Sequence, residues 1–160
     1  MDTLLHRALA LLSYEPETGV FRYLSKTGAR AAGDVAGSRH SEGYVRLKID
    51  GVGYGAHRIA WLMVTGRLPL GQIDHINGVR DDNRMANLRD VPALINCQNR
   101  RFASARNKTG VLGVVPAGDK FSAYIGSGYG CSNLGTFDTK EEAGAAYVAA
   151  KRVAHEGCTL

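Results

Sequence analysis

The sequence predicts an α+β fold made of two small units. Stretches in which apolar and polar residues alternate predict short strands, and apolar residues at helical spacing predict helices. A polar, basic stretch in mid-chain is typical of a linker. A chain of 160 residues has room for one ordinary domain or two small ones. We therefore expect a first domain over residues 1–101, a linker over residues 102–108 and a second domain over residues 109–160.

The first domain is expected to begin with helices and a hairpin. Apolar residues at helical spacing predict helices over residues 3–12 and 57–64. Residues 44–49 alternate between apolar and polar side chains, as in a strand with one buried face. The Asp50-Gly51 pair that follows predicts a tight turn into a return strand near residues 52–54.

The stretch that follows Pro69 predicts a strand, a long polar loop, a second strand and a helix. The first strand ends at Asp74-His75, and the loop after it is rich in Asn, Asp and Gly. The second strand covers residues 88–91, and the helix runs from Pro92 to Arg101. Most of the reactive side chains of the domain are expected in this loop and at the strand ends beside it.

The second domain is expected to be a three-stranded antiparallel sheet packed on one helix. Residues 111–115, 121–125 and 132–137 predict the strands. Thr139 with Glu142 predicts a capping box that opens a helix ending at Gly157. The helix face expected against the sheet consists of small residues and one tyrosine: Ala143, Ala146, Tyr147, Ala150 and Ala154.

Composition excludes several classes of protein. No apolar run approaches the roughly 20 residues of a membrane-spanning helix, and the N-terminus lacks the pattern of a secretory signal. Three cysteines without a CxxC pair indicate neither a disulfide framework nor a cysteine zinc site. We expect a protein that is not secreted and works in a reducing, cytoplasmic setting, without membrane contact or an organic cofactor.

Charge indicates a polyanionic partner. The formal net charge is +5, and no Asp or Glu occurs between Val91 and Gly118. A solvated linker explains the same basic band equally well on charge alone. The exposed face of the strand over residues 44–49, with Tyr44, Arg46 and Lys48, has the same two interpretations: a phosphate-binding face or a solvated one.

The loop segment between the two later strands concentrates groups that suit a metal or a phosphate. A hard divalent cation prefers oxygen ligands and keeps several waters, so Asp74 and Asn96 are a sufficient protein contribution. His75 is the adjacent imidazole that can take a proton from water. Consecutive strand residues point to opposite faces, so both can serve one site only where the strand ends. The Asn77-Gly78 pair provides the required turn.

These residues resemble the HNH homing-type endonucleases of phages and mobile introns, which are built on the ββα-metal nuclease motif. His75, Asn87 and Asn96 fall at the three signature positions. The resemblance covers roughly residues 14–101 and rests on the following segments: Thr18–Phe21, Gly43-Tyr44, Ala56–Trp61, Asp74–Gly78, Asp82–Arg84 and Asn87–Arg89. Asp90 stands where the family commonly has an aromatic residue, and Cys97 where it often has a second Asn.

The resemblance implies a metal-dependent endonuclease that acts on double-stranded DNA in the cytoplasm of a bacterial or phage-infected cell. His75 would be the general base, Asp74 and Asn96 would hold one Mg²⁺ or Mn²⁺ ion, and Asn87 would tie down the loop that positions His75. Hydrolysis would leave a 5′-phosphate and a 3′-hydroxyl. His57, in the helix over residues 57–64, is expected to be a hydrogen-bonded structural histidine, and the remaining histidines to lie on the surface.

The second domain resembles the Apetala/ethylene-response-factor DNA-binding domain over roughly residues 109–157. The segments that carry the resemblance are Gly113-Val114, Lys120–Ile125, Leu134–Thr139 and Glu141–Tyr147. In that family the sheet lies in the major groove, so outward strand side chains would contact DNA. Val115 and Phe121 stand where plant members have an arginine and a tryptophan, so the plant base-reading pattern does not transfer. A module that only packs or binds protein is the alternative.

We expect a monomer that binds and cuts duplex DNA, the second domain bringing the nuclease to its site. A DNA-binding regulator that keeps the fold without cutting is the main alternative, and cleavage of RNA or single strands is a third. The residues expected to contact DNA are basic or polar side chains: Arg46, Lys48, Arg84, Arg89, Arg100, Arg101, Arg106, Lys108, Lys120, Ser122, Tyr124 and Asn133.

Overall fold

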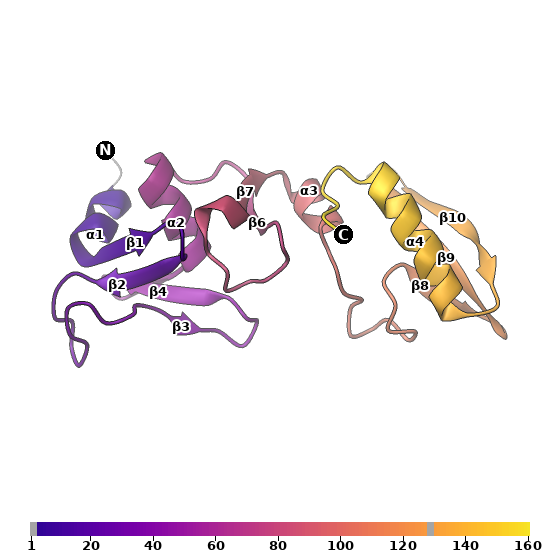
Figure 1. Cartoon of the computed structure of the whole chain (residues 1–160), viewed down its shortest axis with the longest axis horizontal. Coiled ribbons are helices and arrows are strands. Elements are labelled where there is room, and N and C mark those ends of the chain that lie inside the picture. Colours follow the sequence, from indigo (N-terminus) through magenta and orange to yellow (C-terminus); the bar gives the residue numbers. More distant parts are fainter. Residues whose placement is uncertain (1–2, 128–129) are drawn as a thin grey trace. The chain divides into compact units, whose positions relative to one another are not determined.

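The computed structural model describes residues 3–127 and 130–160 and confirms the α+β class (Figure 1). These residues form four α-helices, one short 3₁₀ helix and small antiparallel sheets of two or three strands. The chain divides into two compact units, Met1–Val91 and Pro92–Leu160. No helix in the described ranges combines the length and apolar character needed to cross a membrane.

The first unit is built from short antiparallel pairs around two helices. β1 pairs with β2, β4 pairs with both β3 and β5, and β6 pairs with β7. Its elements in chain order are α1 (Thr3–Leu11), β1 (Leu12–Glu15), β2 (Val20–Tyr23), β3 (Ser38–Arg39), β4 (Val45–Ile49), β5 (Val52–Gly55), α2 (Ala56–Thr65), β6 (Gln72–His75), η1 (Met85–Asn87) and β7 (Leu88–Val91).

The predicted hairpin of the first unit is confirmed. Leu47 and Ile49 of β4 are buried in the core with the apolar residues of α2, while Arg46 and Lys48 are exposed. Alternation along the strand therefore separates a core face from an outer face. In the turn, Asp50 and Gly51 both have positive φ, 48° and 83°, as the favoured two-residue hairpin turn requires.

Two details of the first unit differ from expectation. The first helix ends at Leu11, because Leu12 starts β1 and pairs with Tyr23 of β2. The two-residue strand β3 was not predicted, since Ser38 and Arg39 form it by pairing with β4, which is separate from them in the sequence.

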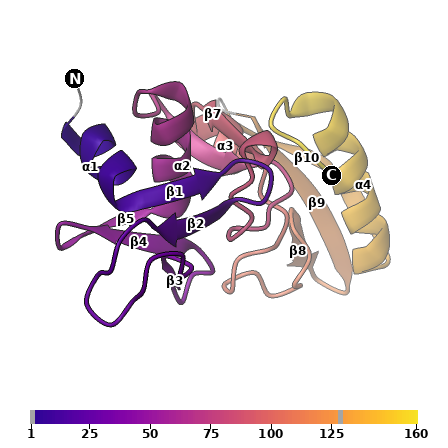
Figure 2. The same ribbon diagram turned by 60° about the vertical axis from the view of Figure 1, so that its left-hand side comes forward.

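The second unit contains a three-stranded sheet in the order β10-β9-β8, with α4 along one face (Figure 2). Its core joins sheet and helix through Val114, Ala123, Ile125, Ala143 and Tyr147. The elements are α3 (Ala93–Gln98), β8 (Val114–Ala117), β9 (Lys120–Ser127), β10 (Gly130–Phe137) and α4 (Lys140–Ala154).

The capping box at the start of α4 is confirmed. Thr139 Oγ1 accepts the N–H of Glu142, and Glu142 Oε2 accepts the N–H of Thr139. The predicted end and inner face of the helix were wrong near the C-terminus. The helix ends at Ala154, which is exposed, and Lys151 is buried instead, with its ammonium group donating to the carbonyl of Arg100.

The basic stretch before β8 is ordered by side-chain hydrogen bonds. The Asn107 amide donates to the carbonyls of Val111 and Val114, each at 3.0 Å, and its oxygen accepts the N–H of Thr109 at 2.9 Å. This turn explains why β8 starts at Val114 rather than at Val111. The structure groups residues from Pro92 onward with the second unit, and the division at residues 101 and 109 stays a prediction.

Candidate active site

The β6–β7 pair holds the two neighbouring residues that the sequence placed at the site. Asp74 lies opposite Arg89 and His75 lies opposite Leu88. β6 ends at His75, where the N–H of Gly78 donates to the His75 carbonyl at 2.8 Å. Asp74 and His75 are only 5% and 4% exposed. The strand therefore turns immediately after His75, as the Asn77-Gly78 pair predicts.

A network of amides fixes the loop between β6 and β7. Asn87 Oδ1 accepts the N–H of Asn77 at 2.9 Å, and Asn87 Nδ2 donates to the carbonyl of Asp82 at 2.8 Å. Asn77 Nδ2 donates to Asp82 Oδ2 at 2.7 Å. These bonds join both ends of the loop to its middle, and Asn87 itself is 7% exposed.

Asp82 is held as an anion by its neighbours. Arg84 donates through Nε to Oδ1 at 2.8 Å and through Nη2 to Oδ2 at 2.6 Å. These charge-assisted bonds lower the pKa of Asp82 to about 2. Arg84, one of the predicted DNA contacts, is exposed but already bound to a carboxylate within its own loop.

His75 has a buried amide as a hydrogen-bonding neighbour. Its Nε2 lies 3.4 Å from Oδ1 of Asn83, which is 2% exposed and accepts the Tyr14 hydroxyl at its carbonyl. Burial lowers the pKa of His75, while the Asn83 contact and the carboxylates of Asp74 and Asp82 oppose that shift. The imidazole is therefore neutral near pH 7 and able to accept a proton.

The carboxylate of Asp74 is paired with Arg89. Nη2 and Nε of Arg89 lie 2.7 Å and 2.8 Å from the same oxygen, Oδ2. A buried carboxylate balanced by one cation is the kind of oxygen ligand that a hard divalent ion accepts. Arg89, predicted to contact DNA, is thus engaged at the candidate metal ligand.

The candidate site lies within a segment that is similar to known nucleases. Residues 54–98 match the HNH_3 family model, which is described as HNH endonuclease. No curated protein and no solved structure matches the chain significantly. The HNH segment, residues 54–98, contains His57, Asp74, His75, Asn87 and Asn96. The match supports a nuclease, which acts on nucleic acid.

The HNH segment also places an unexpected residue beside His75. The His57 ring centroid lies 5.3 Å from that of His75 and 5.4 Å from that of Tyr44, and Tyr44 lies 5.9 Å from His75. We call Tyr44, His57 and His75 the ring cluster. Burial, His75 and Arg58 lower the pKa of His57 to about 4, so its imidazole is neutral.

The expectation of a hydrogen-bonded structural His57 was wrong in one respect. Its Nδ1 is buried and, within the described ranges, accepts and donates no hydrogen bond. The hairpin register could have located it from sequence. Counting outward from Asp50-Gly51 pairs Arg46 with Gly55, and extending this register by two residues on each side brings Tyr44 near His57.

The predicted metal ligand Asn96 lies in α3, which the structure groups with the second unit. Its side chain is half-buried. Among residues 3–127 and 130–160, no group of three or more His, Cys, Asp or Glu side chains is arranged to hold a metal. The assignment of Asp74 and Asn96 as metal ligands stays a prediction.

The predicted DNA contacts in the second unit differ in availability. Arg100, Arg106, Lys108 and Asn133 have exposed side chains, and Tyr124 is half-buried. Arg101 donates to the carbonyl and hydroxyl of Thr159, and Lys120 pairs with Asp138 at 2.7 Å. Ser122 is 4% exposed and its hydroxyl bonds to that of Thr136, so its side chain is not available to DNA.

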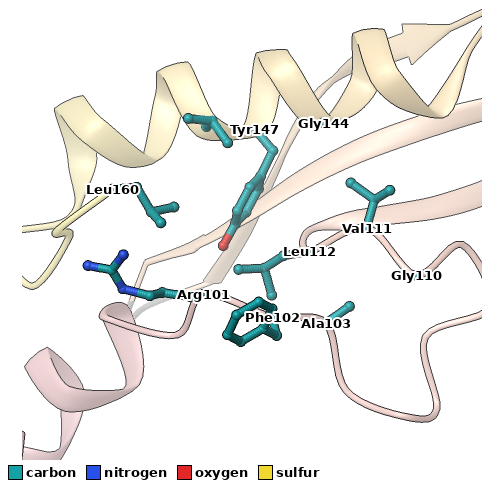
Figure 3. Close-up of a pocket in the computed structure, with 10 residues that line it drawn as sticks. Arg101, Phe102, Ala103, Gly110, Val111, Leu112, Gly144, Tyr147 and Leu160 are labelled. Carbon is teal, nitrogen blue, oxygen red and sulfur yellow. The ribbon is translucent and has the colours of Figure 1, made fainter. Parts of the chain in front are cut away.

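The second unit also contains a mainly apolar pocket of about 380 Å³ (Figure 3). It lies between α4 and the segment that leads to β8, and the Tyr147 ring points into it toward Leu112 and Phe102. Phe102 is 78% exposed. The pocket lies outside the HNH segment and none of the expected catalytic residues line it.

Proposed function

We propose that the protein is a metal-dependent endonuclease that hydrolyses phosphodiester bonds in double-stranded DNA. One observation carries the proposal: a buried, neutral His75 follows the buried Asp74 at the end of β6, directly before a loop held by amide hydrogen bonds, inside the segment that matches HNH endonucleases. A neutral imidazole and an adjacent carboxylate are the groups that activate water and hold a hard cation.

In this proposal His75 accepts the proton of the attacking water. The Asn83 amide oxygen lies against Nε2 and restrains the ring, and Tyr14 in turn holds the Asn83 backbone. Asn87 acts indirectly: its amide hydrogen-bonds to Asn77 and Asp82 and so fixes the turn that begins at His75. Positioning of this kind lowers the barrier without direct contact with the substrate.

Asp74 and Asn96 would hold one Mg²⁺ or Mn²⁺ ion. A carboxylate and an amide oxygen fit a hard cation that keeps several waters, and Arg89 shows that the Asp74 carboxylate accepts a positive partner. Such an ion, when bound, polarises a nonbridging phosphate oxygen and stabilises the leaving 3′-oxygen. The products would be a 5′-phosphate and a 3′-hydroxyl.

The DNA would be held by exposed cations in both units. Arg46 and Lys48 project from the outer face of β4, and Arg100, Arg106 and Lys108 are exposed in the acid-free stretch. We further propose that the sheet of the second unit contacts the major groove through Tyr124 and Asn133, as in the Apetala-like family. A tethered DNA-binding module raises the local concentration of the nuclease at its site.

A plasmid-nicking assay tests the proposal. Wild-type protein is incubated with supercoiled plasmid in Mg²⁺, Mn²⁺ or EDTA, beside His75→Ala, Asp74→Ala and Asn96→Ala. His6→Ala is the matched control, because His6 is exposed on α1, outside the site. We expect nicked or linear plasmid only with metal, its loss in the three site variants and its retention in the control. Binding to the same DNA, measured in EDTA, should persist in all variants.

The same assay separates the alternatives. If the plasmid stays supercoiled with every metal while the protein still binds it tightly, the protein is a non-cleaving regulator rather than a nuclease. Parallel reactions on single-stranded DNA and on RNA test the substrate class, and cleavage confined to either of them would overturn the assignment to duplex DNA. The chemistry of the ends follows from ligation, which requires a 5′-phosphate beside a 3′-hydroxyl.

A further inference from the structure

His57 lies on the outer face of the β4–β5 hairpin. Gly55 is directly opposite Arg46, and residues opposite each other in an antiparallel pair share a face. A Cβ added to Gly55 would lie 2.7 Å from Cε1 of His57, so the imidazole occupies the space above this glycine. The His57 ring therefore lies on the same side of the hairpin as the Arg46 side chain.

This placement brings His57 next to His75, the proposed general base, rather than into the hydrophobic core. The His57 and His75 ring planes meet at 75°, edge to face, with centroids 5.3 Å apart. The Tyr44 ring contacts both of them, at 5.4 Å from His57 and 5.9 Å from His75, and the guanidinium of Arg80 lies over the Tyr44 ring at 5.0 Å. An edge-to-face arrangement at this separation is a favourable and directional contact between flat rings.

We propose that His57 is a positioning residue that fixes the orientation of the His75 ring. The inference rests on the proposed function, in which His75 is the base. On one side of the ring, the Asn83 oxygen lies 3.4 Å from Nε2 of His75. The neighbouring rings of His57 and Tyr44 add a steric restraint to this contact.

A small, neutral ring suits this place. The imidazole fits above Gly55, whereas any side chain at residue 55 would force it out of its present position. Its neutral form also adds no positive charge beside the base, and the N-terminus of α2, where His57 lies, disfavours a cation for the same electrostatic reason. Ring shape and neutrality are therefore what the position requires, and the ring nitrogens are secondary.

Substitutions at residue 57 separate ring shape from hydrogen bonding. His57→Ala removes the ring, His57→Phe keeps a neutral ring without nitrogen, and His57→Asn keeps a polar nitrogen without the ring. We expect the nicking kcat to fall about 10- to 100-fold for His57→Ala and His57→Asn, with most activity restored by Phe. The KM for plasmid and the affinity in EDTA should be unchanged.

Two glycines of β5 provide a second, independent perturbation. Gly55→Ala should displace the His57 ring although no residue of the ring cluster is substituted. A Cβ at Gly53, by contrast, meets nothing within 4 Å. Gly55→Ala should lower kcat as His57→Ala does, and Gly53→Ala should not. The double variant Gly55→Ala/His57→Ala should be no slower than His57→Ala alone.

Several results would overturn the inference. Rescue by Asn but not by Phe would show that a nitrogen of His57 contacts substrate or water, and a parallel loss of DNA affinity would make His57 a binding residue. Equal rates for wild type, His57→Ala and Gly55→Ala would leave His57 without a role. Thermal unfolding of each variant identifies any whose lower rate reflects lost folding, and the remaining variants then decide.

Failure of the proposed function is distinguishable by NMR. Three-bond couplings across χ1 of His75 report its side-chain orientation whether or not the protein cuts DNA. We expect one rotamer in wild type and in His57→Phe, and averaged couplings in His57→Ala. A single rotamer in all three would overturn the positioning role, whereas a wild type that cuts no nucleic acid would overturn the nuclease proposal alone.

Discussion

Arg89 and Asp74 face each other across the β6–β7 pair, and two nitrogens of the guanidinium lie within 2.8 Å of one carboxylate oxygen. The Asp74 side chain is 6% exposed and that of Arg89 is 26% exposed. The pair therefore neutralises a charge that the fold has removed from water. A divalent ion at Asp74 would supply a second positive partner to the same carboxylate.

Replacing Arg89 should make the thermal stability of the protein depend more strongly on Mg²⁺. We expect Arg89→Ala to lower the free energy of unfolding by about 3 kcal/mol, because it removes a cationic partner of a buried carboxylate. Added Mg²⁺ should then raise the Tm more in Arg89→Ala than in wild type, since the ion replaces the missing charge. Arg84→Ala is the control: its pair with Asp82 is exposed on the Arg84 side and should change stability by less than about 1 kcal/mol. An equal Mg²⁺ response in all three proteins would contradict the coupling.

His57 should make the fold sensitive to mild acid. Its pKa is about 4 in the folded chain against an ordinary value of 6.5, so between these pH values the unfolded chain binds a proton that the folded chain excludes. The free energy of unfolding should therefore keep its full value above pH 6.5 and decrease by at most about 3 kcal/mol as the pH falls toward 4. Urea unfolding between about pH 4 and pH 7 measures the dependence, which should be flatter for His57→Phe. A slope that survives the substitution would assign it to other groups.

Asn87 should contribute to stability through both atoms of its amide. Asn87→Ala breaks the bonds to Asn77 and Asp82 and leaves buried groups unpaired, which costs about 1–3 kcal/mol. Asn87→Asp keeps the acceptor for Asn77 but places an anion against the Asp82 carbonyl, so it should not restore stability. Chemical denaturation should show wild type to be more stable than both variants. A stable Asn87→Asp would show that only the acceptor matters.

The exposed cations before β8 should govern the salt dependence of DNA binding. Removing one phosphate-binding cation should reduce the slope of log K against log salt by about 0.9. Fluorescence anisotropy on a duplex, with His75→Ala protein in EDTA, should show this change for Arg106→Ala and for Lys108→Ala. Lys120→Ala should alter the slope less, because Lys120 is paired with Asp138. Equal effects of the three substitutions would argue for a diffuse basic surface.

Features encoded by neighbouring residues were predictable from the sequence. The alternation of β4, the Asp50-Gly51 turn and the capping box of α4 depend on residues a few positions apart, and the structure confirms them. The strand–loop–strand order around His75 was also predictable, since the loop is marked by its Asn, Asp and Gly content.

Features that depend on pairing between distant segments were not predicted from the sequence. Arg89 was placed among the DNA contacts because its partner becomes apparent only from the register of β6 and β7. His57 was expected to be a hydrogen-bonded structural histidine, because its position over Gly55 and beside His75 becomes apparent only in the folded chain. The burial of Lys151 depends on a carbonyl from residue 100, which no helical periodicity can indicate. Side-chain orientation at element ends is thus where local patterns stop being informative.

The amide ties across the β6–β7 loop have a consequence for the encounter with a substrate. The residues between the two strands, Ile76 to Asn87, are restrained by hydrogen bonds that form when the chain folds rather than when a ligand arrives. This segment therefore loses its conformational entropy when the chain folds, before the nucleic acid binds. The free energy of binding is then not reduced by the cost of ordering it. Association should accordingly be limited by diffusion and orientation, with a rate that responds to ionic strength more than to the flexibility of the catalytic loop.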